Sequence, residues 1–525
     1  MKENAGRGRR FAPTIIGRQC ENAKHQLRKH KHLRLLVFSL LGLGFILLWI
    51  KPRTWWKQLN QKIQQNIHLG PCQLVVDYES NDERDFRRYR FPSFEERIKI
   101  YMGEWYLPPE TQDPLCEGRI IYKPLDATQQ KNFHVDQPLF WMKELAWFNS
   151  TDSIGLSNGS SQAIQRFFSF DSKIAPARMF AVHPESMRQC SGAKTPQEHK
   201  MFHYCQDTQS TFQPNLPKED ASTPFLIQYG DASQSRAPFV YAGNYFQNVS
   251  DWSNPVIPHF KKFRQAWARK ELQQFTTTEN CIGRRELLRL RQADTLVTQP
   301  LIWKLNIRRH FKKMKDVPCN DIPWSQKKPM AVFRGRLNGV LDREKFAHAD
   351  DKAVCLAIPR CVLVLKNRES KAVDAKLTDL GRRIGGVIDG YNLTAPHALP
   401  MRQLLRYKAL IILEGNDVSS GLKWALLSQS IVMMPRPRFN SWAMEEALEP
   451  WIHYVPLLDD LSDAEERLNW ILQHEAEALR IVKRANLWML DLVYHPDAQQ
   501  EDLSLYREIL SRYSRHFHRD DSLAP

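Results

Sequence analysis

The sequence lacks the short motifs of several large enzyme classes. It contains no His-Glu-x-x-His pair and no Gly-x4-Gly-Lys-Ser/Thr loop, which removes the usual signatures of zinc proteases and P-loop nucleotide hydrolases. No Asp-x-Asp motif follows an apolar strand, and the nine cysteines include no Cys-x-x-Cys pair. The chain therefore shows no recognised metal-binding motif, and we expect neither a metal site nor a cofactor.

Long uncharged apolar runs are almost as scarce, and one stands out at residues 35–50. With 42% hydrophobic and 25% charged residues, the chain is neither disordered nor a polytopic membrane protein. Ten Lys and Arg residues precede the run and four follow it closely, so the positive-inside rule places the N-terminus in the cytoplasm. We expect a single-pass type II signal anchor; a cleaved signal peptide and a buried helix are the alternatives.

Cysteines and glycosylation triplets agree with that orientation. Eight of the nine cysteines follow the run, which permits up to four disulfides on an oxidising side, although scattered thiols would give the same count. Four Asn-x-Ser/Thr triplets also follow it and none precedes it: Asn149, Asn158, Asn248 and Asn392. The chain ends in Ser-Leu-Ala-Pro, which is no retention signal of the endoplasmic reticulum. We therefore expect a Golgi or other secretory-pathway membrane, with the large C-terminal part in the lumen.

The basic charge does not indicate a nucleic-acid partner. The formal net charge is +17, but about half of the excess lies before residue 35. The remaining Lys and Arg residues are interleaved with acids, and no basic stripe with stacking aromatics is present. We expect no binding of nucleic acid.

Apolar runs separated by polar turns predict an α/β fold. The expected strands are residues 225–229, 331–333, 361–365, 409–413 and 431–434. The unit from 409 to 434 reads as strand, turn, helix and strand, which is typical of a parallel sheet covered by helices. Expected helices are residues 260–272, 284–296 and 419–430, and a long helix opened by a capping box of Ser462 and Glu465.

The turn within residues 410–423 is a candidate anion site. A strand ends at Glu414, and a helix begins after several short polar residues. Backbone N–H groups at such a helix start face the crevice where α/β sheets bind nucleotides. The side chains that we expect to bind a diphosphate there are Asn416, Asp417, Ser419, Ser420 and Lys423.

Two further constellations accompany the turn. Arg334, Gly335 and Arg336 follow the strand at 331–333, with Arg343 nearby, and arginine binds phosphate oxygens with a bidentate fork. Asp231 follows the strand at 225–229, where a carboxylate facing a crevice can act as a general base. A solvated basic loop and an ordinary turn aspartate are the respective alternatives.

The run from residue 406 to residue 456 resembles the signature of glycosyltransferase family 90, and Phe333-Arg334-Gly335 is similar to a second motif of that family. The family includes protein O-glucosyltransferases, capsule xylosyltransferases and lipopolysaccharide glycosyltransferases. The resemblance covers about residues 225–490 and is most specific in its central part.

The resemblance implies a GT-B-like architecture of two Rossmann-like domains. It also implies a UDP-sugar donor, UDP-glucose or UDP-xylose, and transfer with inversion to a hydroxyl of a protein or glycan. Residue by residue, Asp231 would be the base, Arg343 would meet the diphosphate although one extra residue intervenes, and residues 416–421 would form the nucleotide loop. Gly421 is a departure, because eukaryotic protein glucosyltransferases of the family have arginine there.

The expected organisation follows from these features. Residues 1–34 are a cytoplasmic tail, 35–50 the anchor, 51–70 a stem, 71–315 an N-terminal acceptor-side domain, 316–470 a C-terminal nucleotide-sugar-binding domain and 471–525 terminal helices. The departure at Gly421 leaves two alternatives, a catalytically inactive sugar-binding membrane protein of the same fold and a bacterial lipopolysaccharide glycosyltransferase.

Overall fold

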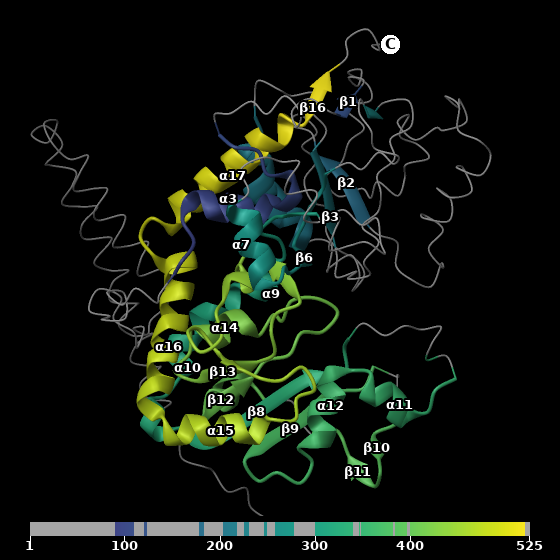
Figure 1. Cartoon of the computed structure of the whole chain (residues 1–525), viewed down its shortest axis with the longest axis vertical. Helices are drawn as coiled ribbons and strands as arrows, with labels where there is room; N and C mark the ends of the chain where they lie inside the picture. Colours follow the sequence, from purple (N-terminus) through teal and green to yellow (C-terminus); the bar gives the residue numbers. More distant parts are fainter. Residues whose placement is uncertain are drawn as a thin grey trace, which may run out of the picture. The chain divides into compact units, whose positions relative to one another are not determined.

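The structure is a computed structural model, and most of its regular elements lie in the C-terminal half (Figure 1). It describes residues 90–109, 120–122, 178–182, 203–217, 225–229, 246–248, 258–277, 300–339, 346, 348–381, 384–395 and 399–519. The chain divides into two compact units, Met1–Ile67 and His68–Pro525, and all described residues belong to the second.

Several sequence predictions fall outside the described residues. They include the apolar run at 35–50, the helix at 284–296, Asp231 and Arg343. Within the described ranges, no helix has the length and hydrophobicity to cross a membrane. The membrane anchor and the domain boundary between residues 315 and 316 therefore stay predictions.

A five-stranded parallel sheet forms the core of the C-terminal half. Its strand order is β15-β13-β12-β8-β9, and every neighbouring pair is parallel. The strands are β8 (Lys328–Arg336), β9 (Val373–Asp379), β12 (Tyr407–Ile411), β13 (Ile431–Met434) and β15 (Val455–Pro456). All four residues of β13 are buried, as expected for a strand covered on both faces. The strands predicted at 331–333, 409–413 and 431–434 are confirmed.

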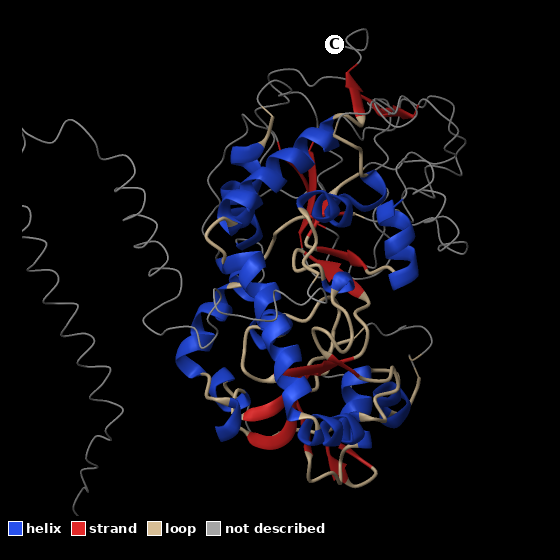
Figure 2. Cartoon of the chain, turned by 60° about the vertical axis from the view of Figure 1, so that its left-hand side comes forward, coloured by secondary structure: helices blue, strands red, loops and turns tan. Residues whose placement is uncertain are grey.

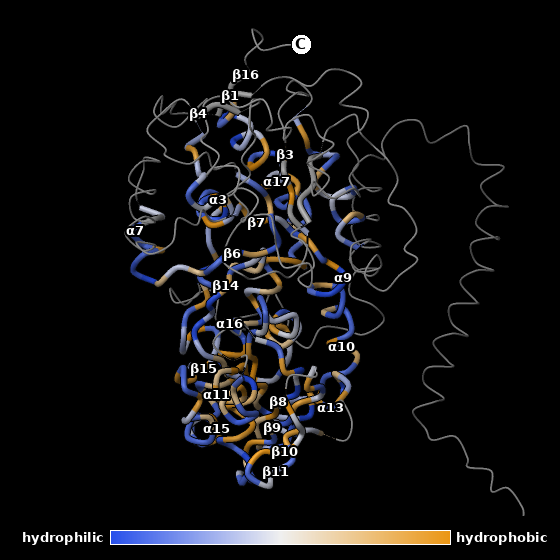
Figure 3. Tube along the Cα trace, turned by 90° about the vertical axis from the view of Figure 1, so that its right-hand side faces the viewer, coloured by the Kyte–Doolittle hydropathy of each residue, from blue (hydrophilic) through white to orange (hydrophobic). Residues whose placement is uncertain are grey.

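Helices cover this sheet (Figure 2). Those that pack on its strands are α12 (Pro359–Lys366) on β9, α15 (Ala464–Gln473) on β8, and α14 (Leu422–Leu426) and α16 (Glu475–Met489) on β13. The hydrophobic segments of the trace gather around the sheet (Figure 3), consistent with the buried cluster that β8, β9, β12 and β13 share with α12, α15 and α16. The remaining short elements of this half are η9 (Trp324–Gln326), β10 (Val387–Ile388), β11 (Tyr391–Asn392) and α13 (Met401–Leu404).

The helix between β12 and β13 is shorter than predicted. The polar pattern predicted a helix over 419–430, whereas α14 contains five residues. Ser428 ends it early, because its hydroxyl donates to the carbonyl of Ala425 in place of a continuing helical bond. The strand–turn–helix–strand order is confirmed.

The strand predicted at 361–365 was wrong, because these residues belong to α12. Pro359 stands in the first turn, where its missing N–H costs nothing and its fixed φ favours a helix. A disulfide between Cys355 and Cys361 ties this helix to α11 (Asp351–Leu356). Cys205 and Cys319 are also disulfide-bonded, so part of the expected disulfide content is present.

A second sheet has the strand order β2-β3-β5-β7, in which β3, β5 and β7 run parallel and β2 is antiparallel. Its strands are β2 (Arg178–Val182), β3 (Phe225–Tyr229), β5 (Phe260–Lys261) and β7 (Leu301–Ile302). The strand predicted at 225–229 is confirmed. A three-stranded sheet joins β1 (Ile120–Tyr122), β4 (Phe246–Asn248) and β16 (Phe517–Arg519), and β10 with β11 and β6 (Phe263–Gln265) with β14 (Phe439–Ser441) form two-stranded sheets.

The helix predicted at 260–272 was wrong in its first half. After β5 the chain forms β6 (Phe263–Gln265), which pairs antiparallel with β14 (Phe439–Ser441) from the C-terminal half. The helix α7 (Arg269–Thr277) starts only afterwards. Basic residues gave the segment a polar appearance, but Lys261, Lys262 and Arg264 are buried in the folded chain.

Helices complete both ends of the described fold. Besides α7, the described helical elements before residue 321 include α3 (Phe94–Met102), η2 (Gly103–Trp105), η5 (Thr208–Phe212), η6 (Gln213–Asn215), α9 (Ile307–His310), η8 (Lys312–Asp316) and α10 (Val317–Asn320). The C-terminal elements are η10 (Glu445–Ala447), α15, α16, η11 (Leu490–Tyr494) and α17 (Ala498–Ser514). The last of these returns to the N-terminal half and packs on α3. The helix predicted after Ser462 exists, but the capping box was wrong: the Ser462 hydroxyl donates to Asp460 instead.

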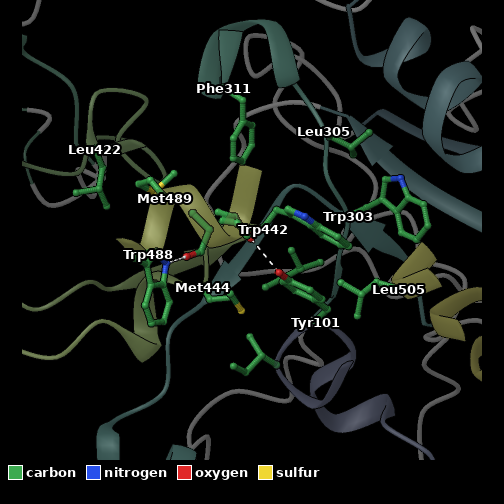
Figure 4. Packing of buried hydrophobic residues seen from close by; sticks show 14 of the residues in the cluster. Tyr101, Trp303, Leu305, Phe311, Leu422, Trp442, Met444, Trp488, Met489 and Leu505 are labelled. Atoms are coloured by element: carbon green, nitrogen blue, oxygen red, sulfur yellow. Dashed lines mark hydrogen bonds between the residues drawn. The ribbon is translucent and has the colours of Figure 1, made fainter. Parts of the chain in front are cut away.

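Aromatic side chains link the two halves in one core. Tyr101 of α3 stacks on Trp442 with ring centroids 4.0 Å apart and donates to its carbonyl oxygen (Figure 4). Trp488 of α16 donates from Nε1 to the carbonyl of Ala443 (Figure 4). Trp303, which follows β7, packs against the same cluster. Residues from α3, the second sheet and the C-terminal helices are therefore buried together.

A buried ion pair fixes the contact of β6 with β14. The Arg264 guanidinium meets both carboxylate oxygens of Glu446, and both side chains are fully buried. Glu446 also accepts from the backbone N–H of Trp267 and from Asn440 Nδ2. A buried pair with this many additional hydrogen bonds offsets the cost of removing its charges from water.

Glu446→Ala should lower the free energy of unfolding by about 3–5 kcal/mol, because it leaves the Arg264 charge buried without its partner. Urea denaturation of the full chain in detergent measures the change. Glu466→Ala is the control: that carboxylate is 74% exposed and 3.7 Å from Arg467 Nη1, so its loss should cost less than about 1 kcal/mol. Equal losses in the two variants would contradict a stabilising role for the buried pair.

Candidate functional site

A pocket of about 310 Å³ opens at the carboxyl ends of β8 and β12. In a parallel sheet this edge is where the strands deliver their loops, and ligands bind there. The pocket is lined by the end of β8, the turn after β12, α12 and α9. Its polar and glycine lining residues are Arg309, Arg334, Gly335, Arg336, Asn338, Arg360, Gly415, Asn416, Asp417, Ser419, Ser420 and Gly421. The structure thus brings together two constellations that the sequence treated separately.

The turn at residues 415–421 is held by its own hydrogen bonds. The backbone N–H of Gly415 donates to the carbonyl of Asp417 over 3.1 Å, and that of Gly421 donates to Ser419 Oγ over 3.3 Å. The side chains of Asn416 and Ser420 line the pocket, and within the described part of the chain neither makes a hydrogen bond. Because α14 has five residues, its dipole adds little, and the positive charge of the pocket comes from arginines.

Arg360, on the first turn of α12, organises the floor of the pocket. Its Nε donates to the carbonyl of Glu414 over 3.0 Å, Nη2 to that of Leu413 over 2.8 Å, and Nη1 to that of Arg336 over 3.1 Å. One guanidinium thereby fixes the ends of β8 and of the β12 segment. Burial lowers the pKa of Arg360 to about 10, so it stays charged at neutral pH.

Two glycines make room for this guanidinium. A Cβ atom on Gly415 would lie 3.2 Å from Arg360 Nη2 and 3.1 Å from the Cβ of Asn338. A Cβ on Gly335 would lie 3.3 Å from Arg360 Nη1 and 2.9 Å from the ring of Phe333. A side chain at either position would therefore crowd Arg360 and its neighbours where both strand ends approach it.

The two arginines of the Arg-Gly-Arg segment differ in their surroundings. Arg334 lines the pocket, but its Nη2 contacts both carboxylate oxygens of Asp374 at 2.8 Å, and its Nη1 donates to main-chain carbonyls. Arg336 is 71% exposed, and its Nε lies 3.5 Å from Asp379. Arg334 is thus held in place by the sheet, whereas Arg336 extends toward solvent.

Asp417 connects the turn to the N-terminal half. Its carboxylate lies 2.5 Å from the Nζ of Lys262, whose side chain is buried. The neighbouring Val418 packs with Phe263 and Phe439. The negative charge that Asp417 brings to the pocket is therefore largely compensated by Lys262.

Lys423 does not line the pocket. Its side chain is fully buried, and its ammonium group bonds to Glu445, which also accepts from Ser441. A buried ammonium requires such a partner, and this pairing directs Lys423 away from the pocket. Its predicted contact with the diphosphate is therefore not supported by its position.

Sequence reasoning missed Arg309 and Arg360. Arg360 was overlooked because the apolar residues after it were interpreted as a strand; Pro359 beside it was the available signal of a helix start. Arg309 lies far from either motif in the sequence, and only the fold places it at the pocket. No group of three or more His, Cys, Asp or Glu side chains in the described ranges is arranged to hold a metal ion.

Residues 297–518 match the model of the family described as Glycosyl transferase family 90. The match covers less than half of the chain, and this part of the chain is similar to that family. The resemblance drawn from the sequence is confirmed, and the pocket lies within the matched region.

Curated relatives agree with that assignment. The O-glucosyltransferase LpsA of Dichelobacter nodosus is 40% identical over 91 residues, which are 17% of this chain and 29% of the relative. Protein O-glucosyltransferase 1 of Rattus norvegicus is 25% identical over 194 residues, 37% of this chain and 43% of the relative. Protein O-glucosyltransferase 3 of Homo sapiens is 33% identical over 89 residues, 17% of each. The chain thus spans less than half the length of these relatives.

Glu414, at the start of the turn, carries a titratable group beside the pocket. Its carboxylate accepts from the backbone N–H groups of Arg438 and Phe439 and from Arg438 Nε, over 3.0–3.2 Å. Burial nevertheless raises its pKa from an ordinary value of 4.5 to about 7. The folded state therefore holds a proton that the unfolded state releases at lower pH.

The stability of the wild-type protein should fall as the pH rises from 4.5 toward 7, because the unfolded state binds fewer protons than the folded state in this range. Glu414→Gln should reduce that fall. Urea unfolding at a series of pH values measures the slope, with Glu477→Gln as the control that removes an exposed carboxyl. An unchanged slope in Glu414→Gln would show that the proton is bound elsewhere.

Proposed function

We propose that this protein is an inverting glycosyltransferase that moves glucose or xylose from a UDP-sugar to a hydroxyl of a glycan or protein. The observation that carries the proposal is an arginine-lined pocket at the carboxyl edge of a parallel sheet, inside the region that matches family 90. The relatives named O-glucosyltransferases support the same reaction class.

The charges of the pocket suit a diphosphate. Four arginines and one aspartate line it, and the aspartate is compensated by Lys262. Arginine forks bind pairs of phosphate oxygens, and fixed cations stabilise the charge that develops on a departing UDP. In this proposal Arg309, Arg336 and Arg360 supply the positive field, while Asn416 and Ser420 offer hydrogen bonds from the turn.

Asp231 is the proposed base. It follows β3 by two residues in the sequence, in the position that the family resemblance assigns to the catalytic aspartate. The acceptor oxygen forms a bond to the anomeric carbon as the bond from that carbon to the phosphate oxygen breaks. UDP departs with the electron pair, and the acceptor proton passes to Asp231. The proposed GT-B arrangement would set this residue opposite the arginine-lined pocket, which we call the donor pocket.

A lipopolysaccharide acceptor is the second candidate, because one relative at 40% identity is bacterial. A protein acceptor is supported by the names of the mammalian relatives. We further propose that residues 35–50 anchor the chain in a Golgi or other secretory membrane with the region that matches family 90 in the lumen. This topology rests on the charge asymmetry and the four glycosylation triplets.

Release of UDP from a panel of UDP-sugars tests the function. We expect turnover with UDP-glucose or UDP-xylose that persists with added chelator, because arginines take the place of a metal at the diphosphate. Asp231→Asn should lower kcat at least 100-fold while UDP binding is kept. UDP binding without turnover by the wild type would instead indicate a sugar-binding protein, and activity in Asp231→Asn would exclude this residue as the base.

Arg360→Met should raise the dissociation constant of UDP at least ten-fold, since it removes a buried cation and three bonds to the strand ends. Isothermal titration with UDP measures the effect. Arg368→Met, which removes an exposed guanidinium just beyond the same helix, serves as the control and should bind UDP like the wild type. Equal affinities in all three proteins would place the diphosphate elsewhere.

A further inference from the structure

A second pocket, of about 440 Å³, adjoins the edge of the same sheet beyond β13 and β15. It is lined by the residues before α3, by α7, and by the loops that surround β15. A third pocket of about 400 Å³ lies between this one and the donor pocket. It shares Val418 and Ser419 with the donor pocket and Arg436 and Asp459 with the second pocket. The three pockets form a row along the carboxyl edge of the sheet.

Tyr454 is the distinctive residue of the second pocket, which we call the Tyr454 pocket. Its side chain is 1% exposed, yet its hydroxyl has no hydrogen-bond partner in the described part of the chain. Among the described residues, the fully buried side-chain atoms that lack a partner do not include this hydroxyl, so it keeps contact with the pocket and is available to bond to a ligand. A ligand that offers a hydrogen bond would supply the partner.

The rest of the lining is amphipathic. Leu272, Leu448 and Leu457 contribute an apolar wall. At the rim, Asp459 is exposed and has no ion-pair partner in the described ranges, and the exposed residue Arg436 donates from Nη2 to the carbonyl of Trp267. A sugar ring matches such a lining, because its C–H faces are apolar and its edge carries hydroxyls that both donate and accept.

We propose that the Tyr454 pocket binds a monosaccharide unit of a glycan acceptor, with the Tyr454 hydroxyl bonded to a ring hydroxyl and with Asp459 and Arg436 at its rim. The inference rests on the proposed transfer function and gives it a substrate class, a glycan rather than an unglycosylated polypeptide. The intermediate pocket would hold the part of the acceptor that extends toward the donor sugar.

Tyr454→Phe tests the site, because it deletes the hydroxyl and keeps the ring. With the full chain in detergent and p-nitrophenyl hexosides and pentosides as acceptors, we expect KM for the acceptor to rise about ten-fold, as for one lost hydrogen bond. The dissociation constant of UDP should not change. Tyr513→Phe is the matched control, since it removes a buried hydroxyl that donates to the carbonyl of Pro258 outside all three pockets.

Saturation-transfer NMR with the same glycosides separates this proposal from the donor reaction, because it requires no turnover. We expect a signal with the wild type and Tyr513→Phe, and its loss in Tyr454→Phe and in the surface variant Asp459→Asn. No signal with any glycoside, or equal signals in all variants, would overturn the proposal, as would turnover of a peptide acceptor that Tyr454→Phe leaves unchanged. Glycoside binding without release of UDP would count against the transfer function alone.

Discussion

The buried ion pair of Arg264 with Glu446 holds together the two segments on which the donor pocket depends. It joins β6 to the chain just after β14, and both side chains are shielded completely from water. Residues 262 and 263, immediately before Arg264, then reach the turn after β12 through Asp417 and Val418. The turn after β12 is therefore held by residues of the N-terminal half of the chain. A substitution at Arg264 would affect the pocket through the neighbouring residues Lys262 and Phe263.

Contacts besides this ion pair set the electrostatics of the pocket. Lys262 compensates Asp417, Asp374 orients Arg334, and Arg360 bonds only to main-chain carbonyls among its described contacts. Among the cations of the pocket, Arg334 and Arg360 are held in position before any ligand binds. Preorganised charge of this kind stabilises a developing anion without the reorganisation that water would require.

The sequence predicted those parts of the fold that local pattern determines. Buried strands such as Ile431–Met434 are continuous apolar runs, and their neighbours in the sheet were found in the same way. The run at 361–365 has the same composition, and periodicity over five residues does not distinguish a buried strand from a buried helix. The helix predicted at 260–272 was wrong in its first half because the basic side chains of residues 260–265 suggested a solvent-exposed segment. These side chains are instead buried by partners distant in the sequence. The turn at 415–421 was recognisable because it is contiguous, whereas Arg309 and Arg360 join it only through tertiary structure.

The structure shows how the glycine at position 421 affects the pocket. A Cβ atom there would lie 3.6 Å from Ser419 Oγ and 3.7 Å from Trp424 Nε1, which are ordinary contacts, and its φ of −79° suits any residue. The backbone therefore does not require glycine at 421, whereas a side chain at Gly335 or Gly415 would crowd Arg360. The arginine that the resemblance expects at 421 would enter from the α14 side of the pocket. Arg360 brings a buried guanidinium from the α12 side, so glycine at 421 leaves the pocket cationic while it opens space beside α14.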